Sequence, residues 1–156
     1  MATAEIVAIG SELLLGQIVD TNSAWMAQRL TALGVNLYSK SVVGDNPGRM
    51  KDVISRALER ADIVITRGGI GPTQDDLTRE IVAEVTGRKL VQDAGMLAQV
   101  EEHFRRRGRP MTPNNIRQSY MPEGAIPIRT PNGTAPSFIV EDPRGVIFSL
   151  PGVPVE

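Results

Sequence analysis

Apolar and polar positions along this chain follow two periods, one typical of buried strands and the other typical of amphipathic helices. Mostly apolar runs predict strands over residues 5–9 and 63–66, and residues 35–43 are predicted to form another strand between them. Between these runs, apolar residues recur every three or four positions, which predicts helices that bury one face. The clearest of the helical patterns is formed by Met50, Val53, Ile54, Ala57 and Leu58.

Residues that favour helix ends support these assignments. Residues 20–22 are all suitable N-caps for the first helix, and Gly34 is a typical stop after it. We expect Trp25 and Met26 of this helix to lie in the core. Further along the chain, Asn46 and Asp93 are each predicted to cap another amphipathic helix.

The last third of the chain is predicted to form short strands near residues 125–128, 137–140 and 146–150, after a short helix over 114–120. Residues 142–145 have the chemistry of a turn, so the last two strands should form an antiparallel hairpin. Strand and helix alternate first and the hairpin comes last. The sequence therefore predicts a three-layer α/β/α fold with a mostly parallel sheet and an antiparallel edge hairpin.

Composition narrows the class of protein further. The 156 residues, 41% of them apolar, are enough for one domain over residues 1–156 with a substantial core. A net charge of −1 gives no basic field for nucleic acid or an anionic membrane. Cysteine is absent, which excludes disulfides and thiolate metal sites. With no signal-peptide pattern and no membrane-length apolar run, the sequence predicts a cytoplasmic protein.

The most informative segment is a glycine-rich loop that follows the third predicted strand. Gly68, Gly69 and Gly71 lie within four positions, immediately before a helical pattern. Such a loop directs unpaired backbone N–H groups to one point, where they attract an anion. Asp75 and Asp76 follow, in the predicted first turn of the helix. Because carboxylates repel a phosphate, they indicate a divalent cation such as Mg²⁺ between the two.

Each acidic residue also has a purely structural interpretation. Thr73 and Asp76 have the spacing of a capping box, and Asp75 would complement the helix dipole. Asp45 is an ordinary turn residue unless the strand order brings it close to Asp76. Glu12 could reach the same crevice or face water. The sequence alone leaves these alternatives open.

Ligands of such sheets bind at the carboxyl ends of the parallel strands. Four segments with site-like composition are expected to meet there, at residues 10–17, 44–46, 68–76 and 151–154. This convergence is a prediction of topology.

Five motifs spread over nearly the whole chain resemble one known family. They lie at residues 10–22, 42–46, 68–78, 133–136 and 150–154. Together they are similar to the N-terminal domains of CinA-type competence/damage-inducible proteins, which belong to the MoaB/Mog molybdopterin-binding family. The resemblance implies a three-layer fold with a ligand over the glycine loop. It places Asp45 and Asp76 in the site, where we expect them to act as catalytic residues and, with Asp75, as metal ligands. The expected ligand-binding residues are Gly10, Glu12, Arg67, Gly68, Gly69, Gly71, Thr73, Gly133, Thr134, Pro151 and Gly152.

The resemblance implies two activities. CinA-type domains are associated with metal-dependent hydrolysis of ADP-ribose to AMP and ribose 5-phosphate. The Mog branch binds molybdopterin and transfers an adenylyl group to its phosphate. The Gly-Pro-Thr-x-Asp-Asp loop of this chain favours the first, so we expect a divalent-metal-dependent pyrophosphatase. A module that binds a nucleotide or pterin without turning it over is the further alternative.

Two departures from the family pattern bear on this expectation. Arg67 stands immediately before the paired glycines, where many relatives have threonine. Its guanidinium could bind phosphate bidentately or point away. Relatives also commonly carry a C-terminal domain that deamidates nicotinamide mononucleotide, so this chain is expected to be part of a longer protein. We further expect a small-molecule ligand and a homo-oligomer.

Overall fold

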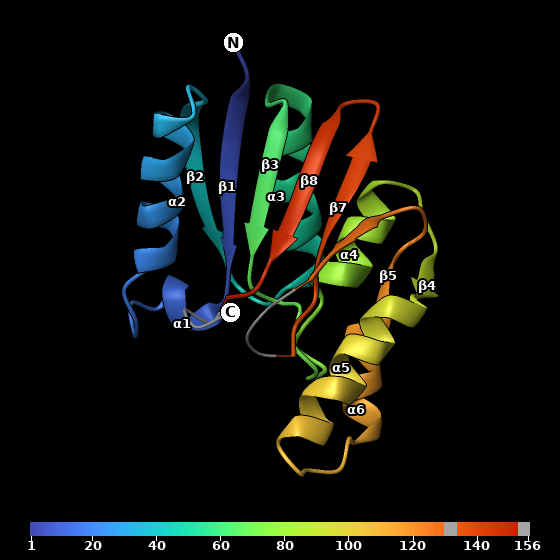
Figure 1. Cartoon of the computed structure of the whole chain (residues 1–156). Helices are drawn as coiled ribbons and strands as arrows, with labels where there is room; N and C mark the ends of the chain where they lie inside the picture. Colours follow the sequence, from blue (N-terminus) through green and yellow to red (C-terminus); the bar gives the residue numbers. More distant parts are fainter. Residues whose placement is uncertain (130–133, 153–156) are drawn as a thin grey trace.

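The computed structural model describes residues 1–129 and 134–152 (Figure 1). A six-stranded sheet forms the middle of the molecule, in the strand order β2-β1-β3-β8-β7-β6. Parallel pairing joins β1 to β2, β1 to β3 and β3 to β8, whereas β7 runs antiparallel to both of its neighbours. The strands are β1 Thr3–Ile9, β2 Asn36–Val43, β3 Ile63–Arg67, β6 Ile126–Ile128, β7 Ser137–Asp142 and β8 Gly145–Leu150.

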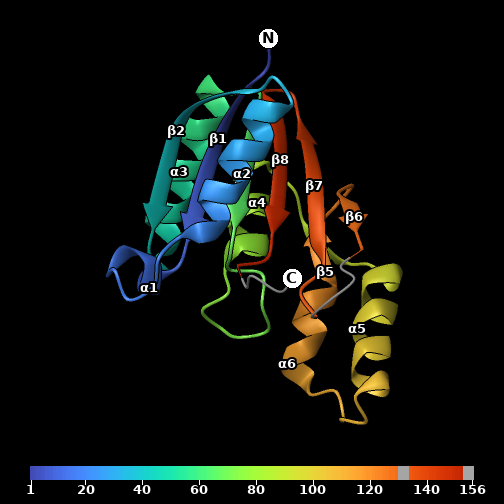
Figure 2. The ribbon, with the colours of Figure 1, turned by 60° about the vertical axis from the view of Figure 1, so that its left-hand side comes forward.

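Helices cover both faces of this sheet, which confirms the predicted three-layer fold (Figure 2). On one face, α2 (Thr21–Ala32) buries Met26 and Leu30 against β1 and β3. On the other face, α3 (Pro47–Arg60) and α4 (Thr78–Val85) enclose the larger core, in which Ile54 and Phe138 are fully buried. No helix within the described ranges is long and apolar enough to cross a membrane.

The predicted caps are present at three helices. Asp20 accepts a hydrogen bond from the first turn of α2 at 3.0 Å, and Asn46 does the same for α3 at 3.0 Å. Asp93 caps α5 (Ala94–Arg106) through an N–H donor at 2.8 Å. Each cap satisfies an amide that has no partner inside its helix.

The C-terminal hairpin is also confirmed. Asp142 pairs with Gly145 where β7 turns into β8. The carboxylate of Asp142 accepts hydrogen bonds from the Arg144 backbone N–H at 3.0 Å and from its guanidinium Nε at 2.8 Å. This side-chain contact closes the turn.

A second, two-stranded sheet was missed by the sequence analysis. It pairs β4 (Leu90–Gln92) with β5 (Tyr120–Pro122) in antiparallel fashion. The helix predicted over 114–120 is therefore too long. The segment forms α6 (Pro113–Ile116) and a 3₁₀ turn, η1 (Arg117–Ser119), before entering β5. Helices α5 and α6 project beyond the carboxyl ends of the parallel strands (Figure 1).

The prediction that Trp25 lies in the core is wrong. Its side chain is 58% exposed, whereas the neighbouring Met26 is buried as expected. The buried face of α2 is formed by Ser23, Met26 and Leu30. At about 100° per residue, Trp25 lies well to one side of the centre of that face. The Trp25 ring instead lies beside the guanidinium of Arg29, whose Cζ is 5.0 Å from the ring centroid.

Candidate anion-binding site

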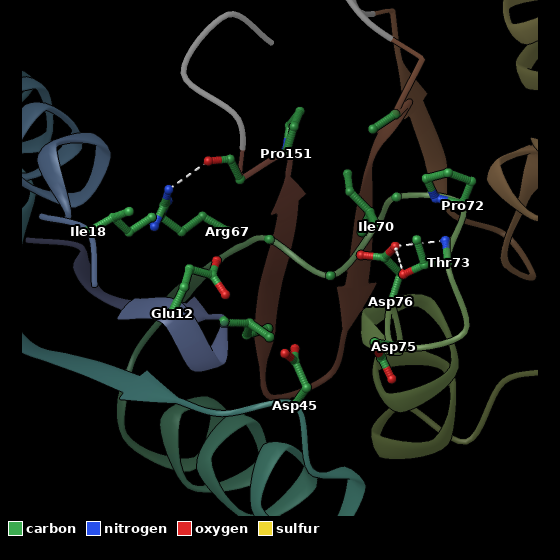
Figure 3. Close-up of a pocket in the computed structure, with 17 residues that line it drawn as sticks. Glu12, Ile18, Asp45, Arg67, Ile70, Pro72, Thr73, Asp75, Asp76 and Pro151 are labelled. Atoms are coloured by element: carbon green, nitrogen blue, oxygen red, sulfur yellow. Dashed lines mark hydrogen bonds between the residues drawn. The ribbon is translucent and has the colours of Figure 1, made fainter. Parts of the chain in front are cut away.

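Described residues from all four of the segments expected at the carboxyl ends of the parallel strands meet there. They line a pocket of about 500 Å³ (Figure 3), and this confirms the predicted convergence. One wall of the pocket includes Glu12 of α1 (Ser11–Leu14), a single helical turn. The lining residues are Ile9, Gly10, Glu12, Ile18, Asp45, Arg67, Gly68, Gly69, Ile70, Gly71, Pro72, Thr73, Asp75, Asp76, Ala135, Pro151 and Gly152.

The pocket loop, residues 68–76, is held by the first residue of α4. Gly68 and Gly69 have φ angles of 97° and 72°, a region that glycine adopts without strain. The Thr78 hydroxyl donates to the Gly68 carbonyl at 2.8 Å, and the Thr78 N–H donates to the Gly69 carbonyl at 3.0 Å. A Cβ on Gly69 would collide with the Thr78 hydroxyl. The loop therefore requires glycine at this position.

Three consecutive backbone donors result from this arrangement. In a trans peptide, the C=O of one residue and the N–H of the next point in opposite directions. Because Thr78 holds the carbonyls of Gly68 and Gly69, the N–H groups of Gly69 and Ile70 face away from α4. Across residues 1–129 and 134–152, no acceptor is found for these two N–H groups or for that of Gly71. Successive unpaired N–H groups of this kind form an anion site.

The predicted start of the helix after this loop is wrong. Helix α4 begins at Thr78, so Asp75 and Asp76 lie in the loop and not in a first helical turn. The Thr78 contacts with the glycines fix where the helix starts, and the segment before it folds into a separate turn. There the Asp76 carboxylate accepts hydrogen bonds from the Thr73 N–H at 2.9 Å and from its hydroxyl at 2.7 Å (Figure 3).

This Thr73–Asp76 contact is the one expected from a capping box, but it serves the turn and not a helix. Its consequence is a fixed orientation of the Asp76 carboxylate beside the loop amides.

Acidic side chains dominate the charge of the pocket. Asp45, in the turn between β2 and α3, accepts a hydrogen bond from the Ser11 hydroxyl at 3.2 Å. Glu12 and Asp45 lie on one side of the pocket and Asp76 on the other, beside Thr73 (Figure 3). Asp75 also contributes to the lining.

These carboxylates do not form a ready-made metal cage. Among the residues that the structure describes, no group of three acidic, histidine or cysteine residues could hold a metal ion. Mg²⁺ in proteins is commonly held by one or two carboxylates together with substrate phosphates. The donor set therefore fits a cation that binds together with a phosphate ligand.

Arg67 is engaged by the protein itself. Its side chain is 5% exposed, and Nη1 lies 3.0 Å from Oδ1 of Asp20. Nη2 donates to the carbonyl of Gly152 at 2.7 Å (Figure 3), which also accepts from Asn22 at 3.4 Å. This placement favours the alternative in which Arg67 points away from the loop amides. Phosphate binding by Arg67 stays a prediction.

Two of the predicted ligand-binding residues, Gly133 and Thr134, are not among the described residues that line the pocket. Gly133 lies outside the described residues. Thr134 does not line the pocket, and its hydroxyl accepts a hydrogen bond from Gln118 at 3.1 Å. Apolar lining residues such as Ile9 and Ile18 were not among the predicted site residues, because the prediction rested on polar and glycine motifs. Ile70 and Pro72 lie inside the glycine loop, and that position was the available sequence signal for them.

Taken together, these features define a three-layer α/β domain in which loop amides without an acceptor among the described residues lie beside acidic side chains at the carboxyl edge of the sheet. The sequence profile described as "Probable molybdopterin binding domain" matches residues 5–156. The chain belongs to this molybdopterin-binding family, in its CinA branch.

Relatives of known sequence and structure agree with this assignment. A "Putative competence-damage inducible protein" of Halothermothrix orenii is 52% identical over 153 residues, which is 98% of this chain and 37% of the relative. The chain thus spans about a third of the length of such relatives. The crystal structure of CinA from Thermoplasma acidophilum matches with a TM-score of 0.90 and 34% identity, covering 98% of this chain and 89% of that one.

A more distant structure shows the shared fold alone. The molybdopterin biosynthesis enzyme MoaB of Thermus thermophilus matches with a TM-score of 0.64 at 19% identity. The match covers 99% of this chain and 83% of the MoaB chain.

Proposed function

We propose that this domain binds a phosphorylated heterocycle of the molybdopterin class, with the phosphate on the amides of Gly69, Ile70 and Gly71. The observation that carries the proposal is the run of three consecutive N–H groups without an acceptor among the described residues. Family membership supports a pterin as the heterocycle. A pocket of about 500 Å³ lies in the usual range for small-molecule sites, roughly 300–1,000 Å³.

The remaining lining residues would complete the contacts. Apolar side chains such as Ile18 and Pro72, which are at least partly exposed, offer surface to a flat ring, and the acidic residues favour a cation beside the phosphate. Binding would therefore require the phosphate and strengthen with Mg²⁺.

Calorimetry with a matched pair of probes tests this proposal. A pterin phosphate should bind the purified chain at least tenfold more tightly than the same pterin without phosphate, about 1.4 kcal/mol. Gly69→Ala should remove this difference. The control is Gly34→Ala, since Gly34 has a similar φ of 75° but no atom within 4 Å of the added methyl. Equal affinity for the two pterins would overturn the proposal.

Hydrolysis of an ADP-ribose-like pyrophosphate is the second candidate, and the carboxylates favour it. Asp45 and Asp76 line the same pocket as the amide site, and anion binding alone does not need them. A divalent metal held there would neutralise phosphate charge and increase the acidity of water. Asp45 and Asp76 would supply its protein oxygens or accept a proton. One water is consumed as the bridging P–O bond breaks: its oxygen enters one of the two monoesters, AMP or ribose 5-phosphate, and protons are released.

The test for catalysis is AMP release from ADP-ribose, with and without Mg²⁺. The Asp45→Asn, Asp76→Asn double variant should lose turnover while it stays folded. Asp52→Asn is the control, because Asp52 pairs with Arg56 on the exposed side of α3. Turnover that survives in the double variant excludes these residues from catalysis. Absence of turnover with tight pterin binding favours a binding module or the Mog-type adenylyl transfer.

A further domain and self-association remain proposals about the whole protein. The greater length of the relatives is consistent with an additional C-terminal domain, for which nicotinamide mononucleotide deamidation is the expected activity. Light scattering on this chain tests the expected homo-oligomer.

A further inference from the structure

Two arginines lie behind the pocket loop and bind its carbonyl groups. Arg79, on α4, donates from Nη2 to the carbonyls of Ile70 and Gly71, the latter at 2.9 Å. Arg117, in η1, donates from Nη1 to the Thr73 carbonyl at 2.5 Å and from Nη2 to the Asp76 carbonyl at 3.2 Å. Four carbonyls of a single loop are thus held by two guanidinium groups.

The Arg79 contact completes the pattern that Thr78 begins. Thr78 binds the carbonyls of Gly68 and Gly69, and Arg79 binds the next carbonyl, that of Ile70. Since the following N–H points the opposite way, the Gly71 amide faces away from Arg79. Three consecutive peptide planes are therefore oriented by the beginning of α4, and all three present their N–H groups on the other side.

Arg79 is an unusual residue in this position because it is 1% exposed. No carboxylate lies within ion-pair distance of Arg79 in the described part of the chain, and its Nη1 has no hydrogen-bond partner there. Burial lowers the pKa of Arg79 to about 10, an effect that the carboxylates of Glu80 and Asp76 partly offset. The side chain is still cationic at neutral pH. Its charge is therefore available to favour an anion on the opposite side of the loop.

Arg117 connects the loop to a different part of the fold. Its Nη2 also contacts Oε1 of Glu80 at 2.8 Å. The next residue, Gln118, is 1% exposed and donates to the Thr134 hydroxyl at 3.1 Å, next to the pocket residue Ala135. Two adjacent residues of η1 thus contact the pocket loop and the residue that precedes Ala135.

We propose that Arg79 and Arg117 are positioning residues for the anion site. They hold the loop carbonyls on the side away from the ligand, so that the amides of Gly69, Ile70 and Gly71 form a fixed site for a terminal phosphate or pyrophosphate. The inference rests on the proposed function, in which this loop binds phosphate.

Arg117 is the better residue for the test, because its side chain is 29% exposed and its loss is less damaging to the core. The variants are Arg117→Met and Arg117→Lys. The matched control is Arg88→Met, because Arg88 also donates to two carbonyls, those of Glu123 and Glu141, but does not line the pocket. Arg79→Lys serves as a second variant that keeps the charge but replaces the planar guanidinium by a compact ammonium group.

Two measurements are made on each folded variant: backbone ¹⁵N order parameters without ligand, and the Kd for inorganic pyrophosphate with Mg²⁺. In Arg117→Met, order parameters of residues 73–76 should fall from about 0.85 towards 0.6, and pyrophosphate should bind at least tenfold more weakly. Arg117→Lys should recover part of the affinity. Arg88→Met should lower the melting temperature without changing either measurement.

The outcomes separate this inference from the proposed function. A wild-type chain that does not bind pyrophosphate or the pterin phosphate overturns both. A wild-type chain that binds, with affinity and loop order unchanged in Arg117→Met and in Arg79→Lys, overturns the positioning role alone.

Discussion

A Cβ on Gly71 would lie 2.7 Å from Oδ2 of Asp76, the oxygen that accepts both hydrogen bonds from Thr73. Gly71 does not have a positive φ, unlike Gly68 and Gly69. The need for glycine here is therefore one of space and not of backbone strain.

Gly71→Ala is expected to give a folded protein that binds a pterin phosphate at least tenfold more weakly, about 1.4 kcal/mol. The added methyl must displace the Asp76 carboxylate, which disturbs the turn beside the amide site. Calorimetry gives the affinity and a melting curve gives the stability. Gly48→Ala is the control, because the nearest atom to its new methyl is 3.7 Å away. Unchanged affinity in folded Gly71→Ala would make this glycine purely architectural.

The charge of Asp76 can be separated from its hydrogen bonding. Asp76→Asn keeps an oxygen that can accept from Thr73 but removes the negative charge. Without Mg²⁺, ADP-ribose should bind Asp76→Asn more tightly than wild type, because the repulsion is gone. We expect about 1 kcal/mol, roughly fivefold. With Mg²⁺, wild type should bind ADP-ribose more tightly than Asp76→Asn. An affinity ratio that does not depend on Mg²⁺ would show that Asp76 has no role in cation binding.

Much of the fold could be predicted because local chemistry and periodicity agree. The caps at Asp20, Asn46 and Asp93 coincide with the starts of amphipathic patterns, so each signal supports the other. The β4–β5 sheet could not be predicted in this way. Its strands are three residues long and are paired across the intervening helices α5 and α6. A period cannot be recognised over so few residues.

The candidate site was predictable as a set of segments but not as a set of contacts. Gly68 and Asp45 could be placed at the same sheet edge because the carboxyl ends of parallel strands meet there. The helix start at Thr78 depends on a hydroxyl–carbonyl bond across ten positions, which no local rule gives. The roles of Arg79 and Arg117 depend on tertiary contacts in the same way.

The turn of the C-terminal hairpin should make the free energy of unfolding depend on pH in the acidic range. The Arg144 side chain lowers the pKa of Asp142 by hydrogen bonding to its carboxylate, against an opposing effect of burial. The pKa of Asp142 in the folded state is therefore below its value of about 3.9 in the unfolded state. The ionised Asp142 thus stabilises the fold fully above about pH 3.9. This stabilisation is lost as the pH falls through the folded pKa.

Asp142→Asn should therefore lower the free energy of unfolding by about 1 kcal/mol at pH 7, and the difference from wild type should shrink below about pH 4. Urea unfolding at several pH values measures this. Asp52→Asn, at an exposed pair on α3, should cost less than about 0.5 kcal/mol at any pH. A loss for Asp142→Asn that is the same at pH 7 and pH 3 would contradict the assignment to the ionised carboxylate.

Variants of the ion pair between Arg67 and Asp20 can show whether Arg67 stabilises the fold or binds the ligand. The two side chains are 5% and 20% exposed, with Nη1 and Oδ1 3.0 Å apart. Removing one partner leaves the other charge poorly solvated, so Arg67→Thr should cost about 3 kcal/mol of stability. Asp20→Asn should cost less, because asparagine can still cap α2.

A double-mutant cycle in urea decides between the two roles. If Arg67 serves mainly to hold Asp20 and the Gly152 carbonyl, the double variant should be more stable than the sum of the single effects by about 1–3 kcal/mol. Pterin phosphate affinity should then fall in parallel with the order of residues 151–152. If the single effects add within about 0.5 kcal/mol and Arg67→Thr alone weakens phosphate binding, the guanidinium contacts the ligand directly and the structural assignment is wrong.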